Sequence, residues 1–455
     1  MPKETEIKLR ATPATLAALR EHPLLNKRNK SGWQQHALFN QYYDTPARDL
    51  AAARVALRVR RDGEQFIQTL KSRGQSVAGL SERNEWDWYL HSAELDVSKL
   101  DDSCWPASLT GLDKTTLQPI FSTDFLRDKA DLAWGRGKTK VAIEAALDLG
   151  KVCAGTQQED ICELELELRE GEPAALLELA IELAANLPLM PCDISKAERG
   201  YRLFDAASYS LSLPAPDLLP EQSLDDAFAA LAWHLLGSSQ RLAEQYRFNG
   251  HWKLLEQWLQ QLTDLRALLS SLGQAAPRAS SHPLREALDA LLKDWRPLLQ
   301  AGQQDAQRRQ DAPARFAEEL GNTRWGHFSL QASLWLLQRQ WVSTRNERGS
   351  RQGQAPLGKW LPRLLAAEVA DLPLKRYQQQ PEDLAEQLPR IERLLAWLRH
   401  ARPLSALPEV DRLYGELLKL EELAHLPINA EQLAARAMQA HTVTTLRAWK
   451  QLSRS

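Results

Sequence analysis

The sequence predicts two domains, an N-terminal α+β domain built on an antiparallel β-barrel and an all-α C-terminal helical-bundle domain. Up to about residue 205, strand patterns recur with hairpin turn signals between them, as in a closed antiparallel sheet. Beyond residue 222, leucine and alanine recur at helical spacing instead. A proline-rich run separates the two patterns. The predicted boundaries are therefore 1–207 for the barrel domain, 208–222 for a linker and 223–455 for the helical domain.

The barrel domain opens on a strand from Glu4 to Arg10, whose charged side chains share one face. A helix follows from Thr12, an N-cap residue with proline directly after it. Asp62-Gly63 is the strongest hairpin turn signal, and a second turn is expected at Gly150. The remaining expected strands are 36–43, 55–61, 65–73, 83–90, 118–127, 138–148 and 159–169, and the remaining helices are 47–53, 172–186 and 195–204.

The helical domain is predicted from apolar residues that repeat every three or four positions. The segment 345–358 is polar and contains three glycines, so a flexible loop is expected there. The tryptophans of this half fall mostly within helices, and we interpret them as core residues. The expected helices are 224–246, 252–272, 283–300, 328–341, 357–369, 382–400, 408–424 and 430–452.

The composition excludes several classes of partner. The formal net charge is −2, so no overall electric field attracts nucleic acid or a membrane surface. No stretch approaches the ~20 apolar residues of a membrane-spanning helix. The four cysteines fit neither a zinc spacing nor a small disulfide framework, which indicates buried thiols in a reducing compartment. We therefore expect a cytoplasmic protein with no membrane or nucleic-acid partner.

Acidic residues recur at a period of two on the expected strands. If these side chains converge, each close pair repels by roughly 4 kcal/mol at 4 Å and an effective dielectric near 20. Such a cluster either holds protons or binds a hard cation, and carboxylates suit Mg²⁺ or Mn²⁺. The alternative is a set of solvated outer strand faces, which is favoured for any single Glu-x-Glu pattern. The acidic set is Glu4, Glu6, Glu144, Asp148, Glu163, Glu165 and Glu167.

Basic residues form a second set with the same spacing. Arginine binds phosphate through two parallel hydrogen bonds, and lysine acts as a point charge. Together the two sets predict phosphoryl transfer to water, a reaction that needs charge neutralisation and alignment but no covalent nucleophile. The alternative is a surface ladder of cross-strand ion pairs. The basic set is Lys8, Arg58, Arg60, Lys71, Arg83, Arg127 and Lys196.

Over residues 1 to about 205 these motifs resemble the CYTH superfamily, the triphosphate tunnel metalloenzymes. Glu4-x-Glu6-x-Lys8 is similar to the ExExK signature of that family. The resemblance implies an eight-stranded antiparallel tunnel with a charged interior. The later motifs follow in the family's order: Tyr43-Asp44-Thr45, Leu57-Arg58-Val59-Arg60, Thr69-Leu70-Lys71, Arg83 with Glu85, Phe125 with Arg127, Glu144 with Asp148, Glu163 to Glu167, and Ser195-Lys196 with Arg199-Gly200-Tyr201.

The resemblance also implies a role for each group of residues. Lys8 and Glu85 would complete the catalytic network of the tunnel. Divalent cations, Mg²⁺ or Mn²⁺, would be held by Glu4, Glu6, Asp148, Glu163 and Glu165. The triphosphate would be bound by Arg58, Arg60, Lys71, Arg83, Arg127 and Lys196.

The implied activity is metal-dependent hydrolysis of inorganic triphosphate to pyrophosphate and phosphate. Members of the family also act on thiamine triphosphate, or convert ATP as cyclases, so an adenylate cyclase or another organic triphosphatase on the same scaffold is an alternative. A third hypothesis is a polyphosphate-binding module without catalysis. The full set of metal-type carboxylates argues against this third hypothesis, because anion binding alone gains nothing from Glu163 and Glu165.

The helical half resembles the CHAD domain in position, length and helix pattern. This resemblance implies polyphosphate as a second partner, bound by arginines that follow a histidine on one helix. In this sequence Glu256 occupies the position expected for that histidine. Of the expected arginines, this helix contains only Arg266. Arg390, Arg393 and Arg399 form the best remaining basic stripe. A scaffolding or docking role is therefore the alternative for this half.

Overall fold

The computed structural model describes residues 3–72, 74–77, 79–135, 140–207, 209–271, 273 and 275–454, in two compact units. The barrel unit comprises Met1–Ser212, Ala243–Phe248 and Ala314–Leu334. The helical unit comprises Leu213–Leu242, Asn249–Pro313 and Trp335–Ser455. The domain boundaries taken from the sequence, with a linker at 208–222, stay a prediction. Residues 73, 138, 139, 208 and 272, which belong to predicted segments, lie outside the described residues.

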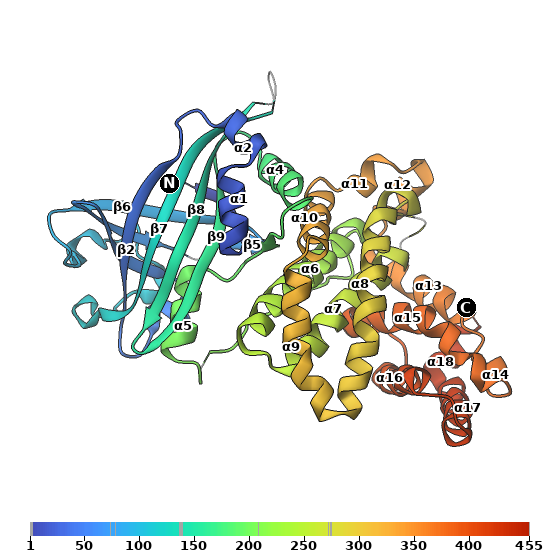
Figure 1. Ribbon diagram of the computed structural model, residues 1–455. Coiled ribbons are helices and arrows are strands. Elements are labelled where there is room, and N and C mark those ends of the chain that lie inside the picture. Colours follow the sequence, from blue (N-terminus) through green and yellow to red (C-terminus); the bar gives the residue numbers. More distant parts are fainter. Residues whose placement is uncertain are drawn as a thin grey trace. The chain divides into compact units, whose positions relative to one another are not determined.

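Antiparallel strands close the barrel in the order β1-β9-β8-β7-β2-β3-β4-β6, and β6 pairs back with β1 (Figure 1). This architecture confirms the predicted eight-stranded barrel with a helical region after it. Two short strands extend the sheet, β5 (Gln75–Val77) on β6 and β10 (Met190–Pro191) on β1. The barrel strands are β1 (Lys3–Arg10), β2 (Gln34–Asp44), β3 (Ala56–Asp62), β4 (Gln65–Lys71), β6 (Leu80–Leu90), β7 (Gln118–Trp134), β8 (Val141–Ala154) and β9 (Gln157–Glu170).

The outer face of the barrel is apolar, and helices cover part of it (Figure 1). Ile7 and Leu9 of β1 are fully buried in a core that includes Leu16, Leu19 and Leu176. Successive side chains of a strand point to opposite faces. Burial of Ile7 and Leu9 on the outer face therefore directs the charged residues next to them to the inside. The covering helices are α1 (Pro13–Arg20), α2 (Pro23–Arg28) and α4 (Ala174–Ala184).

Helix α5 (Lys196–Phe204) packs against β7, β8 and β9. Ser195 caps its N-terminus by accepting a hydrogen bond from the backbone N–H of Glu198. Gly200 allows the close approach of the helix, because a Cβ there would lie 2.1 Å from the Phe121 ring. The helix start therefore places Lys196 against the barrel interior. A further short α-helix of this part of the chain is α3 (Asp49–Ala52).

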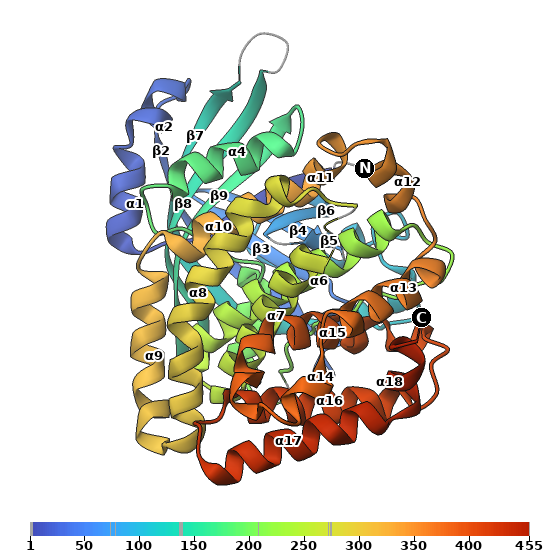
Figure 2. The ribbon, with the colours of Figure 1, turned by 90° about the vertical axis from the view of Figure 1, so that its right-hand side faces the viewer.

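The second half is all helical, as predicted. Trp258, Trp295 and Trp397 are buried in its core, and α16 and α17 lie side by side (Figure 2). The helices are α6 (Leu224–Asn249), α7 (Trp252–Ser271), α8 (Arg278–Gln304), α9 (Ala306–Leu320), α10 (Arg324–Leu337), α11 (Gln340–Ser343), α12 (Glu347–Gly353), α13 (Leu357–Ala370), α14 (Leu374–Tyr377), α15 (Leu388–Ala401), α16 (Val410–His425), α17 (Ala430–Thr445) and α18 (Arg447–Leu452).

The turn predicted at Gly150 is wrong. Gly150 lies inside β8 and pairs with Phe125 of β7 and Ile161 of β9, and the chain turns at Gly155 instead, with φ +58. A Cβ on Gly150 would lie 2.2 Å from the backbone oxygen of Asp124. Glycine is therefore required here for close strand packing rather than for a turn.

The loop predicted at 345–358 is also wrong, because α12 lies within it. Asn346 starts this helix by accepting a hydrogen bond from the backbone N–H of Gly349 at 2.9 Å. Gly353 ends the helix. A Cβ on this glycine would lie 2.5 Å from an oxygen of Asp225. The glycines that suggested a loop are thus explained by packing. Helix α9 and the extension of β7 to Trp134 were not expected either.

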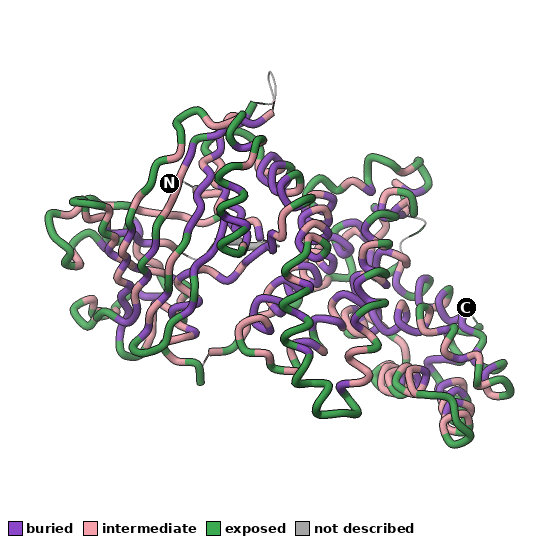
Figure 3. Tube along the Cα trace, viewed as in Figure 1, coloured by how far each residue is buried: buried purple, intermediate pink, exposed green. Residues whose placement is uncertain are grey.

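Buried residues alternate with partly exposed ones along the strands, while most connecting turns are exposed (Figure 3). All four cysteines are free, and three of them are buried, as predicted. Within the described ranges, every helix is too short or too polar to cross a membrane.

Candidate functional site

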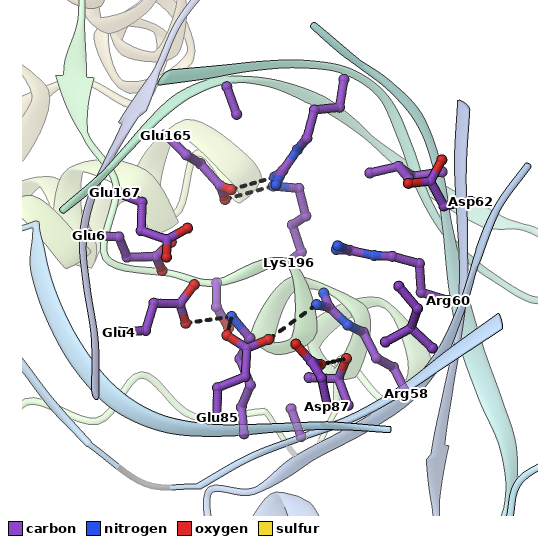
Figure 4. Close-up of a pocket in the computed structure, with 18 of the residues that line it drawn as sticks. Glu4, Glu6, Arg58, Arg60, Asp62, Glu85, Asp87, Glu165, Glu167 and Lys196 are labelled. Carbon is purple, nitrogen blue, oxygen red and sulfur yellow. Dashed lines mark hydrogen bonds and ion pairs between the residues drawn. The ribbon is translucent and has the colours of Figure 1, made fainter. Parts of the chain in front are cut away.

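A cavity of about 490 Å³ runs inside the barrel, and charged side chains from the strands and α5 line it (Figure 4). We call this cavity the bore. Two of the predicted site residues, Asp148 and Glu163, are not among its lining residues; they are fully buried directly beside it. The structure brings the other predicted site residues together in the lining: Glu4, Glu6, Lys8, Arg58, Arg60, Lys71, Arg83, Glu85, Arg127, Glu165 and Lys196.

One wall of the bore is acidic. Glu4, Glu6, Glu165 and Glu167 lie together on one side, across from Arg58 and Arg60 (Figure 4). The wall arises because β1 pairs with β9 in a register that sets Glu6 directly opposite Glu167. Like charges in directly opposed positions destabilise a sheet. This arrangement is therefore suited to a cation that neutralises both.

The opposite wall is basic and incompletely neutralised. Arg60 donates a hydrogen bond to Asn40 at 2.8 Å, but it forms no ion pair with any carboxylate in the described part of the chain. Burial and the neighbouring Arg58 and Arg127 lower the pKa of Arg60 to about 9. Within the same described ranges, Arg83 forms no ion pair either. The basic wall thus lacks negative charge, which a bound anion would supply.

Glu85 links the two walls. Its carboxylate accepts an ion pair from Lys71 at 3.0 Å and lies 3.6 Å from Arg58, while Lys71 also contacts Glu4 at 2.7 Å. Burial alone would raise the pKa of Glu85, but Lys71, a hydrogen bond with Glu4 and Arg58 together lower it. Glu85 is therefore ionised at neutral pH and holds two cations in place.

Lys8 lies between the carboxylates of β1 and β9. Its Nζ is 3.3 Å from Glu6 and 3.3 Å from Glu165. Burial would lower the pKa of Lys8, but Glu6, Glu165 and Glu163 raise it above its ordinary value. Lys8 therefore stays protonated, and its chemistry is that of a fixed positive charge rather than a general base.

A compact ionic cluster, which we call the floor, lies where α5 meets the strands. Lys196 Nζ is 2.7 Å from Asp148 and 2.8 Å from Glu165, and it also pairs with Glu163. Arg127 donates two hydrogen bonds of 2.7 Å to Asp148, and Arg199 pairs with Glu163. Burial would raise the pKa of Glu163, but Arg199 and Lys196 lower it. The floor carboxylates are therefore already neutralised by protein cations.

Two groups of carboxylates at the bore are candidates to hold a divalent cation. On the floor, ligand atoms of Asp148, Glu163 and Glu165 lie within 4.8 Å of one another, but protein cations compete for them. On the acidic wall, burial, together with Glu4 and Glu144, raises the pKa of Glu167 to about 7 despite Arg169. Burial and like charges thus outweigh the ion pair between Glu167 and Arg169. A hard divalent cation at the acidic wall would offset them.

Sequence reasoning missed Tyr42 as a lining residue. The motif taken from this region was Tyr43-Asp44-Thr45, but Tyr43 packs outside the barrel and Tyr42 faces the bore. The Tyr42 ring stacks on Phe121 with centroids 4.7 Å apart. Burial would raise the pKa of Tyr42, but the charge and hydrogen bond of Arg58 lower it. The period-two spacing of the bore residues Leu38 and Tyr42 on β2 was the available signal.

Residues 2–201 match the family model of the CYTH domain. The resemblance drawn from the motifs is thereby confirmed for this part of the chain. Over 203 residues the chain is 34% identical to an inorganic triphosphatase of Haemophilus influenzae, a match that covers 45% of this chain and 55% of that protein. The chain therefore spans about half the length of this curated relative.

Solved structures also match part of the chain. One is a putative adenylyl cyclase from Hippeastrum, described as having a dominant triphosphatase activity; it is 22% identical and covers 44% of this chain and 95% of its own, with a TM-score of 0.32. Another is a putative adenylate cyclase from Bacillus halodurans, 19% identical, covering 41% of this chain and 94% of its own, with a TM-score of 0.27. Similarity at this level carries no argument about activity.

Proposed function

We propose that the barrel unit hydrolyses inorganic triphosphate to pyrophosphate and orthophosphate with the help of Mg²⁺ or Mn²⁺. One water molecule is added across a phosphoanhydride bond, so the reaction needs no other reactant. The observation that carries the proposal is the pair of facing walls. Arg60 forms no ion pair with any described carboxylate, and four carboxylates crowd together across from it. Burial and the neighbouring carboxylates raise the pKa of one of them, Glu167, in spite of its ion pair with Arg169. The similarity of residues 2–201 to the CYTH domain supports it.

In this proposal the basic residues bind and align the phosphate chain. Arg58, Arg60 and Arg83 present guanidinium groups that are only partly neutralised or lack an acidic partner among the described residues. Such groups bind phosphate oxygens through paired hydrogen bonds. Lys71, Arg127 and Lys196 complete the set, and their ion pairs with Glu85, Asp148 and Glu163 keep them in position.

The metal would be held by Glu4, Glu6 and Glu165, with Glu167 as a further ligand. When bound, a divalent cation bridges phosphate oxygens and lowers the pKa of a bound water. Asp148 and Glu163, also predicted as metal ligands, have suitable spacing, and we propose that they mainly orient Lys196, Arg127 and Arg199. Lys8 and Glu85 act as the catalytic network: Lys8 fixes Glu6 and Glu165, and Glu85 fixes Lys71 and Arg58.

A substrate panel tests the proposal. The full chain is incubated with triphosphate, ATP, thiamine triphosphate and long-chain polyphosphate, each with Mg²⁺, Mn²⁺ or a chelator. We expect phosphate release that is fastest with triphosphate and is abolished by chelation. Formation of cyclic AMP from ATP would identify a cyclase instead. Tight binding of triphosphate without turnover in either metal would identify a binding module, and both results would contradict the proposal.

For the helical unit we propose a scaffolding or docking role. The arginines that would bind polyphosphate are engaged within the unit: Arg266 pairs with Asp289 at 2.8 Å, and Arg393 pairs with Glu368 at 2.8 Å. Arg399 pairs with Asp264. Free thiols are typical of a reducing compartment, so we propose the cytoplasm as the location of the protein.

A further inference from the structure

A second group of metal-type side chains lies in the helical unit, in addition to the bore. Glu392 of α15 and Glu421 and His425 of α16 bring one ligand atom each to within 4.8 Å of one another. Glu421 and His425 are four residues apart, so they share one face of α16. The two helices pack against each other. Three ligand atoms from two facing helices are therefore brought together at one point.

The charges around this group do not balance. Asp264 of α7 is paired with Arg399 and lies 3.1 Å from Nε2 of His400. One oxygen of Glu392 is paired with Arg296 of α8 at 2.7 Å. Glu421 has no hydrogen bond or ion pair with any residue in the described part of the chain.

The His425 ring is held in one orientation. Gln300 lies 3.1 Å from Nδ1 of His425. An imidazole oriented in this way, next to a carboxylate that has no partner among the described residues, is an arrangement that binds metals.

We propose that Glu392, Glu421 and His425 bind one divalent transition-metal ion, such as Zn²⁺ or Co²⁺, which links α15 to α16. The imidazole distinguishes this site from the all-carboxylate wall of the bore, because histidine favours first-row transition metals and carboxylates alone favour Mg²⁺. Three protein ligands leave the remaining coordination position to water. The competing explanation is a proton shared by Glu392 and Glu421, with Arg296 paired to Glu392.

Cobalt titration of the full chain separates the two explanations. Excess Mg²⁺ occupies the bore, Co²⁺ is added, and the bound equivalents and the visible absorption of Co²⁺ are measured. The variants are His425→Gln and Glu421→Gln. The control is His441→Gln, which removes an exposed histidine of α17. A circular dichroism spectrum establishes that each variant is folded, and the nearly isosteric Glu421→Gln serves if His425→Gln does not fold.

We expect wild type and His441→Gln to bind one more equivalent of Co²⁺ than either site variant, with visible absorption that indicates a nitrogen ligand. The site variants should lose affinity by about 10-fold or more. Equal Co²⁺ binding in wild type and Glu421→Gln would overturn the proposal. So would an absence of any Co²⁺ bound to wild type in excess Mg²⁺.

Discussion

Each charged side chain of the bore is held by partners of opposite charge, and the exceptions identify the site. Buried ion pairs cost desolvation energy that an apolar interior would avoid. Lys8, Glu85 and Lys196 are nevertheless kept ionised by two or more neighbours each. Arg60 forms no ion pair with any described carboxylate, and burial and its basic neighbours lower its pKa. Burial and neighbouring carboxylates raise the pKa of Glu167 although Arg169 pairs with it, so positive charge is in short supply there. A phosphate chain with its metal would supply both charges.

Glu167→Gln tests the acidic wall at the level of a single residue. If Glu167 is a metal ligand, its loss should raise the Mg²⁺ concentration needed for half-maximal triphosphate hydrolysis by roughly tenfold or more. The matched control is Glu170→Gln, which changes an exposed glutamate at the end of the same strand. An unchanged Mg²⁺ requirement in Glu167→Gln would exclude this residue as a ligand.

Among the secondary-structure elements, α5 has a strict packing requirement that bears on the site. It carries Lys196 into the floor and Arg199 onto Glu163, and it can do so only because Gly200 lets the Phe121 ring touch its backbone. The helix is therefore a rigid support for the floor rather than a mobile cover.

Gly200→Ala should destabilise the barrel unit by about 1–3 kcal/mol, because the new methyl group would overlap the Phe121 ring. Gly415→Ala is the control, since a Cβ there meets nothing within 4 Å and alanine favours a helix. Thermal unfolding of the two variants measures the difference. A Gly200→Ala variant as stable as Gly415→Ala would show that α5 has room to shift.

The segment of α6 that belongs to the barrel unit carries a buried carboxylate, Glu244. It accepts hydrogen bonds from Arg10 at 2.7 Å and from Arg247 at 3.2 Å. Burial would raise the pKa of Glu244, but these arginines lower it below its ordinary value. The group therefore stabilises the fold above the unfolded-state pKa of about 4.3, and this stabilisation is lost as the pH falls through its folded pKa.

Glu244→Gln should leave the buried Arg10 with the longer 3.5 Å contact to Glu159 in place of its pair with Glu244, and should lower stability at pH 7 by about 3–5 kcal/mol. The difference from wild type should shrink as the pH is lowered below about 4, because the unfolded wild-type chain then binds a proton at Glu244 that the folded protein has to release. Urea unfolding of wild type and Glu244→Gln at several pH values measures this difference in the free energy of unfolding. A difference that is independent of pH would refute the electrostatic explanation.

For the whole molecule, the sequence allowed the bore to be predicted because a period of two is a direct consequence of strand geometry. Glu6, Arg60 and Glu165 face the bore as that period requires. The complete burial of Asp148 and Glu163 beside the bore could not be predicted, because it depends on how α5 packs onto the sheet. Gly150 was misplaced because sequence alone does not separate a glycine needed for a turn from one needed for close packing.

The central claim is that the inner charged face of the barrel binds and cleaves triphosphate, and neighbouring arginines on β3 test it most directly. Arg60 lines the bore, while Arg61, the next residue, is exposed on the outer face. The measurement is kcat/KM for triphosphate hydrolysis with Mg²⁺ in Arg60→Ala and Arg61→Ala. The account predicts a fall of about 10²–10³-fold in Arg60→Ala and a rate near wild type in Arg61→Ala. Equal rates in the two variants would contradict it.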